Sequence, residues 1–101
     1  MAKVRWTSEA ERWLREIYSY ISQDNVNAAQ QVVAGISKKT HILRDFPEIG
    51  YKYRTAPEGD IRILLYGHYR IAYLIRNDGP IDILGVFHGA MDVDRYLKIL
   101  A

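Results

Sequence analysis

The stretch that decides the fold is Ile81 to Leu97, with the sequence IDILGVFHGAMDVDRYL. Its first part is mostly apolar and predicts a buried strand over Ile81 to Phe87. The strand breaks at His88-Gly89, and Asp92 is a favourable N-cap for a short helix over Asp92 to Leu100. A strand that brings His88 to its end, beside a glycine and an aspartate, indicates either a candidate site or a plain turn between two elements.

Composition excludes several classes of protein. The 101 residues fit one domain, 1–101, and 49% hydrophobic with 26% charged residues is typical of a soluble globular chain. No apolar run approaches the ~20 residues that span a membrane, and the N-terminus lacks the apolar stretch of a secretory signal. We therefore expect a cytoplasmic protein. Without cysteine, and with only the scattered His41, His68 and His88, we expect no metal and no cofactor.

Basic residues are concentrated in the middle of the chain. Residues 38–76 contain eight basic and four acidic residues, a local charge of +4 within a chain of net +2. Such a bias suits an anionic partner, either a nucleic acid or an acidic protein segment. A solvated basic face is the alternative. The basic residues are Lys38, Lys39, Arg44, Lys52, Arg54, Arg62, Arg70 and Arg76.

The first half of the chain predicts a short strand and two helices. Alternation over Lys3 to Trp6 indicates a half-buried strand. Ser8 and Glu11 have the spacing of a capping box and predict a helix to Gln23. The turn formers Asp24-Asn25 separate it from a second helix, which ends at Phe46 or before because proline follows. A short connection between two helices predicts an antiparallel hairpin.

The second half predicts strands. Residues 47–60 contain two prolines and two glycines and indicate an irregular connection, in which Lys52 and Arg54 alternate with tyrosines. Such alternation can bind a nucleic acid, or simply form a loop. Strands over 61–66 and 69–76 flank a two-residue turn at Gly67-His68, of type II′ because glycine comes first. The prediction is an α+β fold of order β-α-α-β-β-β with a short C-terminal helix, in which a helical hairpin packs on a mainly antiparallel sheet.

Two residues are candidates for chemistry. Arg70 lies among apolar strand residues, so it either pairs with a carboxylate such as Asp82 or Asp92, or reaches an open surface and binds an anion. Arg62, on the preceding strand, could share that surface. His88 could act as a general base, but its segment contains no nucleophile, and a hydrogen-bonded residue at a strand end is the alternative.

Four segments, in this order and spacing, resemble the RelE/ParE superfamily of bacterial toxins from type II toxin-antitoxin modules. They are VRWTSEAERWLREIYSYI, FPEIG, HYRIAYLI and IDILGVFHGAMDVDRYL. The resemblance spans nearly the whole chain and implies the fold predicted above. RelE-like toxins are ribosome-dependent endoribonucleases that cut mRNA with cations on the sheet. ParE-like toxins are similar in fold but poison DNA gyrase.

The RelE set of residues matches this chain poorly. Arg70 matches one arginine of that set, but the two strand lysines fall on Ile61 and Ile63, and the arginine after the last strand falls on Gly89. Tyr96 lies only near the expected tyrosine. Lys52, Arg54 and Arg62 could compensate from shifted positions, which keeps a nuclease that acts on ribosome-bound mRNA as an alternative.

The segment HGAMD, followed by Arg95 and Leu97, looks like the ParE branch, where a histidine and an aspartate bracket the last strand and its helix. The resemblance therefore implies a ParE-like toxin that inhibits DNA gyrase by binding and is not an enzyme. A non-toxic relative is a further alternative, because an arginine common near Met91 is absent. The candidate contact residues are Lys52, Arg54, Arg62, Arg70, His88, Asp92 and Arg95.

The resemblance also implies a cognate antitoxin as partner. Such antitoxins wrap a largely disordered, amphipathic segment around the toxin and fold as they bind. The antitoxin, and not this chain, is expected to bind operator DNA.

Overall fold

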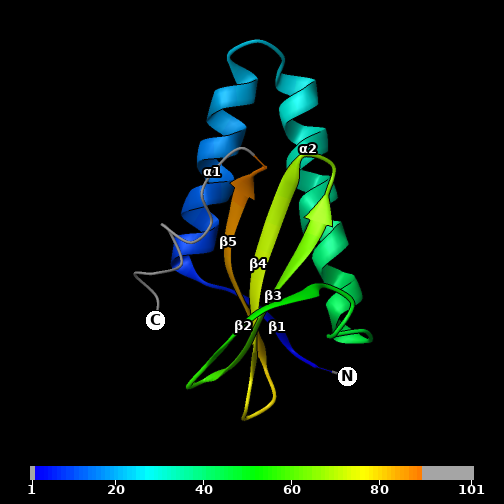
Figure 1. Ribbon diagram of the computed structural model, residues 1–101. Coiled ribbons are helices and arrows are strands. Elements are labelled where there is room, and N and C mark those ends of the chain that lie inside the picture. Colours follow the sequence, from blue (N-terminus) through cyan, green and yellow to red (C-terminus); the bar gives the residue numbers. More distant parts are fainter. Residues whose placement is uncertain (1, 90–101) are drawn as a thin grey trace.

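The computed structural model describes residues 2–89, in which two helices pack on a five-stranded sheet (Figure 1). The strands lie in the order β1-β5-β4-β3-β2; β1 is parallel to β5 and the other neighbours are antiparallel. The predicted α+β fold is confirmed, with one strand more than expected. The elements are β1 (Val4–Trp6), α1 (Ser8–Ser22), α2 (Val26–Thr40), the 3-10 helix η1 (His41–Arg44), β2 (Tyr51–Ala56), β3 (Gly59–Tyr66), β4 (Tyr69–Arg76) and β5 (Ile81–His88).

The N-cap of α1 is Thr7, so the predicted capping box at Ser8 and Glu11 is wrong. The Thr7 hydroxyl accepts a hydrogen bond from the Ala10 amide at 3.1 Å and donates one to the Ile83 carbonyl at 2.7 Å. Thr7 is still extended because it follows β1 directly, and it fixes the start of α1 to β5. Helix α2 is capped by Asn25, whose side-chain oxygen accepts a hydrogen bond from the Ala28 amide at 3.0 Å.

The second helix is shorter than predicted. Its α-helical part ends at Thr40, and His41–Arg44 form a 3-10 turn. The i→i+3 hydrogen bonds of such a turn satisfy backbone carbonyls that have no partner within the α-helix. Gly35 lies inside α2 where a Cβ would come within 1.8 Å of the Tyr66 hydroxyl oxygen. The helix therefore accepts a poor helix former so that Tyr66 of β3 can pack against it.

Strand β2 lies within the segment 47–60 that was predicted to be irregular. It pairs with β3, and the register shifts at a bulge between Lys52 and Arg54. The bulge breaks the two-residue alternation by which strands are recognised, so the sequence did not reveal it. Strand β3 begins earlier than predicted, at Gly59, where φ is 151° and a Cβ would lie 1.9 Å from the Ile75 carbonyl oxygen. Only glycine fits this close contact between β3 and β4.

The β3–β4 turn is as predicted. Gly67 has a φ of 56°, and no other residue type in 2–89 has a positive φ, as a type II′ turn requires. Figure 1 shows this turn on the side of the α1–α2 connection, whereas the β2–β3 and β4–β5 turns extend at the opposite end of the molecule. Within residues 2–89, no helix is long and apolar enough to cross a membrane.

Both faces of the sheet are apolar and buried, as their sequences predicted. The helix face packs against Ala10, Ile36 and Leu43 from the helical region. The opposite face forms a second cluster, against which Trp13, Tyr53 and Ala56 pack. The helix predicted over Asp92 to Leu100 lies outside the described residues. The helix face presents Leu64, Ile71, Tyr73, Ile81, Ile83 and Val86, and the opposite face presents Ile61, Ile63, Ala72, Leu74, Leu84 and Phe87.

Candidate functional site

Arg62 and Tyr73 form a cross-strand pair that holds the loop from Pro47 to Gly50. Nη1 of Arg62 donates hydrogen bonds to the Glu48 carbonyl at 3.1 Å and the Gly50 carbonyl at 2.6 Å. The Tyr73 hydroxyl donates to the Pro47 carbonyl at 2.6 Å and accepts from the Gly50 amide at 3.0 Å. Four hydrogen bonds from two side chains thus fix the FPEIG segment. We call this arrangement the loop clamp.

Gly50 is required at the centre of the loop clamp. A Cβ at this position would lie 2.6 Å from the Ile63 carbonyl oxygen and 2.7 Å from the Tyr73 hydroxyl oxygen. Tyr73 is fully buried, and burial raises the pKa of its hydroxyl above the ordinary value. The hydroxyl therefore stays protonated and keeps donating at neutral pH. Arg62 was predicted as a contact residue. In the structure, Nη1 of its guanidinium group binds the loop carbonyls.

The bulge places Lys52 and Arg54 on different faces of the sheet. Lys52 pairs with Arg62 in the register of β2 and β3, is exposed, and lies 3.7 Å from Asp60 through its Nζ. Arg54 pairs with Ile61 and so lies on the opposite face, where its guanidinium group is 6.0 Å from the Tyr53 ring centroid. The predicted alternation of basic and aromatic residues therefore does not form one nucleic-acid surface.

Arg70 lies on the face opposite to Arg62, so the prediction that the two share a surface is wrong. Its register partner is Leu65, three residues along β3 from Arg62, and an odd separation reverses the face. The predicted ion pair between Arg70 and Asp82 is also wrong. Asp82 instead binds Arg5 at 2.8 Å and Arg76 at 3.5 Å. Asp82 is in register with Leu74, four residues or roughly 13 Å along β4 from Arg70.

His88 and His68 meet at the end of the sheet that Arg70 occupies. Their ring centroids are 6.3 Å apart with planes inclined at 27°, and the Tyr69 ring contacts His88 edge-on at 5.9 Å. The Gly89 amide donates a hydrogen bond to the His68 carbonyl at 2.7 Å, which joins the end of β5 to the turn. A cavity of about 490 Å³ opens here. We call its lining the hairpin-tip site: Leu65, Gly67, His68, Tyr69, Arg70, His88 and Gly89.

Arg70 and His88 reach this cavity from opposite faces of the sheet, because Arg70 is in register with Phe87 and His88 with Tyr69. Burial raises the pKa of Tyr69, so its hydroxyl remains protonated at neutral pH. His68 and Leu65 were missed by sequence reasoning. The predicted turn at Gly67-His68 contained the signal for His68. The observed pairing of Tyr69 with His88 brings the two histidines to one end of the sheet.

Among residues 2–89, the face that carries Arg70 has no second basic strand residue close to it. The two positions expected to hold lysines carry Ile61 and Ile63, which are 3% and 1% exposed. Arg54 lies on this face but pairs with Ile61, four residues or roughly 13 Å along β3 from the partner of Arg70. Among residues 2–89, no group of three or more His, Asp or Glu side chains could hold a metal ion.

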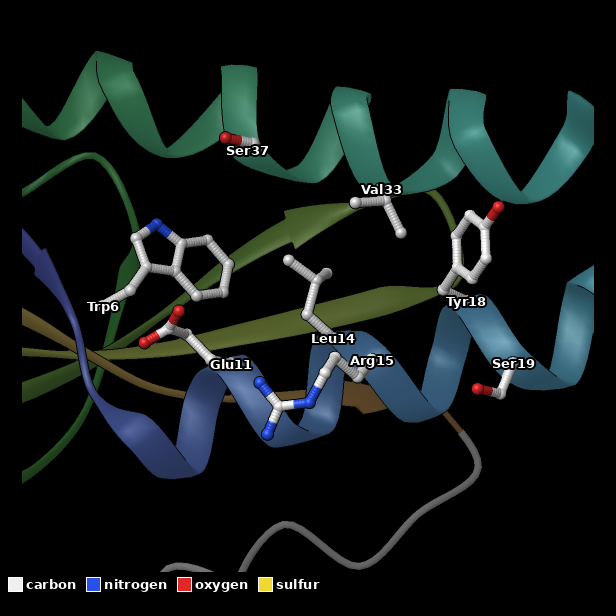
Figure 2. Close-up of a pocket in the computed structure, with 8 residues that line it drawn as sticks. All are labelled: Trp6, Glu11, Leu14, Arg15, Tyr18, Ser19, Val33 and Ser37. Atoms are coloured by element: carbon white, nitrogen blue, oxygen red, sulfur yellow. The ribbon is translucent and has the colours of Figure 1, made fainter.

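A second candidate is a groove between the two helices, with a volume of about 510 Å³. Figure 2 shows Leu14 of α1 and Val33 of α2 pointing toward one another, with Trp6 at one end and Tyr18 toward the other. Glu11 and Arg15 contribute one charge of each sign at its edge. This groove was not predicted, because Tyr18 lies off the apolar stripe of α1 and the other lining residues come from separate elements. Its lining residues are Trp6, Glu11, Leu14, Arg15, Tyr18, Ser19, Val33 and Ser37.

Comparison with known proteins identifies the family. The model of the ParE toxin of the type II toxin-antitoxin system, parDE, matches residues 4–93. The chain belongs to the ParE toxin family. It is 36% identical over 86 residues, 85% of this chain and 86% of the relative, to a protein of Sinorhizobium fredii named "Putative toxin Y4kP".

Two solved structures share the fold of this ParE toxin. A chain of the chromosomal ParDE toxin-antitoxin system from P. aeruginosa superposes with a TM-score of 0.71 and 21% identity, over 87% of this chain and 96% of that one. A chain of the RelBE2 toxin-antitoxin complex from Mycobacterium tuberculosis superposes with a TM-score of 0.54 and 26% identity, over 86% and 96%. The RelE/ParE superfamily fold is thus confirmed. The proposed contacts of Asp92 and Arg95 lie outside the described residues and stay predictions.

Proposed function

We propose that this ParE toxin inhibits DNA gyrase by binding it, without a catalytic step of its own. The observation that carries the proposal is the burial of Ile61 and Ile63 on the face of Arg70. Cleavage of RNA needs several positive groups around the charge that develops on the phosphate, because each supplies part of its stabilisation. Among the described residues of the hairpin-tip site, Arg70 is the one arginine, and the two strand positions expected to hold lysines on its face are apolar.

The hairpin-tip site is the candidate contact with gyrase. It lies at one end of the sheet, and Leu65 there has 56% of its surface exposed although it is a large apolar residue. Arginine is enriched at interface hot spots, and Leu65 adds apolar surface that a partner would remove from water. The rigid hairpin presents both residues without a cost for ordering a loop.

Purified toxin should inhibit DNA supercoiling by gyrase in a concentration-dependent way. Replacing Leu65 and Arg70 together, as Leu65→Ser with Arg70→Ser, should weaken inhibition by at least tenfold, since interface anchors each contribute about 1–2 kcal/mol or more. Glu58→Gln, an exposed change at the other end of the sheet, serves as a matched control. Full supercoiling activity at saturating wild-type toxin would refute the proposal.

We further propose that an antitoxin neutralises the toxin by binding the groove between α1 and α2. The groove is long, open and lined by Trp6, Leu14, Tyr18 and Val33, which suits the apolar side of an amphipathic helix. The two similar structures come from a toxin-antitoxin system and a toxin-antitoxin complex. Leu14→Asp should abolish binding of the product of the reading frame beside the gene. Unchanged binding by a folded Leu14→Asp variant would place the antitoxin elsewhere.

The second candidate function is ribosome-dependent cleavage of mRNA. It is favoured by one observation, the position of Arg70 beside His68 and His88 at an open cavity. In a translation extract, this function predicts codon-linked cleavage of mRNA that Arg70→Ala removes. Intact mRNA at toxin concentrations that inhibit gyrase would exclude it.

A further inference from the structure

Trp6 lines the groove between α1 and α2 and also a second cavity, of about 390 Å³, so the two cavities adjoin the same side chain. The second cavity is formed by β1, the residues before it and the 3-10 turn η1 that follows α2. We call it the basic pocket because Lys3, His41 and Arg44 line it together with Ala2, Val4 and Trp6, and none of these described lining residues is acidic.

The charges at the two ends of this composite groove differ. Along the groove itself, Glu11 and Arg15 offset each other. At the basic pocket, Lys3 and Arg44 each contribute a full positive charge, and Lys38 and Lys39 add two more in the last turn of α2. Asp45 follows Arg44 in the chain, and the C-terminus of α2 acts as roughly half a negative charge. Among the described residues that line the basic pocket, every charged side chain is basic.

We propose that the groove and the basic pocket together bind the antitoxin helix in one direction, with its acidic C-terminal end on Lys3, His41 and Arg44. This inference rests on the proposed neutralisation by an antitoxin. A helix C-terminus carries partial negative charge on its unpaired carbonyls, and carboxylates there add to it. The basic side chains Lys3 and Arg44 would attract this end, whereas they would repel the partial positive charge of a helix N-terminus.

The directions of α1 and α2 define the direction of the bound helix. Helix α1 begins beside Trp6 and runs away from the basic pocket, whereas α2 runs toward it and ends at Thr40 (Figure 2). The bound helix is therefore parallel to α2 and antiparallel to α1. From Ser8 to Ser19 the α1 wall is roughly 17 Å long, enough for about 11 helical residues and three turns of apolar anchors, before the acidic end reaches the pocket.

The chain contains no cysteine, so single cysteines can report the direction directly. Ala2→Cys places a probe in the basic pocket and Ser19→Cys places one at the far end of the groove. Each full-length variant is labelled with a benzophenone maleimide, bound to the purified product of the reading frame beside the gene, irradiated and mapped by mass spectrometry. The Ala2 probe should mark the acidic C-terminal end of the bound antitoxin helix, and the Ser19 probe its N-terminal end. The reverse order would overturn the inference.

Charge reversal supplies an independent test. Lys3→Glu with Arg44→Glu should weaken antitoxin binding about tenfold at low salt, and the difference should shrink at high salt because exposed charges are screened. Arg12→Glu, a reversal on α1 outside the groove lining, is the matched control and should change affinity little. Thermal unfolding of each variant verifies that it is folded.

The outcomes separate the two proposals. If the wild-type toxin forms no complex with the neighbouring gene product, neutralisation by that protein fails and the inference fails with it. If the complex forms but the double reversal binds as tightly as Arg12→Glu at low salt, only the inference is overturned, and the antitoxin remains a partner.

Discussion

Two arginines on neighbouring strands have opposite surroundings in this protein. Arg62 of β3 lies on the helix face, where it donates hydrogen bonds to two loop carbonyls and pairs with the buried Tyr73. Arg70 of β4 lies on the other face, beside the exposed Leu65 and a cavity at the hairpin tip. The first arginine holds the protein's own backbone, and the second faces a space that a partner can enter.

The difference is one of strand register and not of residue type. Successive side chains of a strand point to opposite faces, so the register partners Leu65 and Arg70 lie three positions from Arg62 and face away from it. A basic strand residue is therefore informative about function only after its face is known. Three experiments test whether the loop clamp is structural while the hairpin-tip site is available for binding.

The largest effect is expected at the loop clamp, in Gly50→Ala. The added Cβ would clash with the Ile63 carbonyl and the Tyr73 hydroxyl, and overpacking of this kind costs about 3 kcal/mol. Urea denaturation followed by circular dichroism measures the loss. The control is Gly67→Asn at the hairpin tip, where the added Cβ meets nothing within 4 Å; the positive φ strains any side chain, asparagine less than most, so a loss of about 1 kcal/mol is expected. Equal losses at both glycines would show that the clamp has no special role.

An intermediate effect should separate the two arginines directly. Arg62→Met should lower the free energy of unfolding by about 2 kcal/mol, because it removes charged donors from two carbonyls. The loss is moderated because Nε of Arg62 is buried without a hydrogen-bond partner. Arg70→Met should change stability by less than about 0.5 kcal/mol. Similar stability losses in these two variants would contradict the assignment of Arg62 to structure and Arg70 to binding.

The smallest effect within the loop clamp is expected for Tyr73→Phe, at about 1–2 kcal/mol, because it removes one hydroxyl and leaves the Gly50 amide unpaired. Burial raises the pKa of Tyr73 above that of the unfolded chain. Its stabilisation is therefore complete below about pH 10 and is lost as pH rises further, since the unfolded state then ionises first. Stability of the wild type should fall more steeply than that of Tyr73→Phe between about pH 10 and 11. Parallel profiles would mean that another group governs alkaline unfolding.

The sequence predicted the helical hairpin and the last three strands because their periodicity and turn residues agree. It missed β2 because a bulge at Tyr53 breaks the alternation, and it placed the N-cap at Ser8 because only the structure shows that Thr7 reaches the Ile83 carbonyl.

The candidate site could be predicted only in part. Arg70 and His88 were selected by residue type, and both line the hairpin-tip cavity. Arg62 lies on the face opposite to Arg70 because of the register between β3 and β4. This register depends on turn geometry and on long-range strand pairing. The groove was not foreseen because it joins Trp6, Leu14 and Val33 from three separate elements.

The most direct test compares two activities of one toxin preparation in parallel assays. DNA supercoiling by gyrase and the integrity of mRNA in a translation extract are measured over the same range of toxin concentration. We expect supercoiling to stop while the mRNA remains intact, and Leu65→Ser with Arg70→Ser to restore supercoiling. Cleaved mRNA with unaffected supercoiling would contradict the account and assign the hairpin-tip site to RNA.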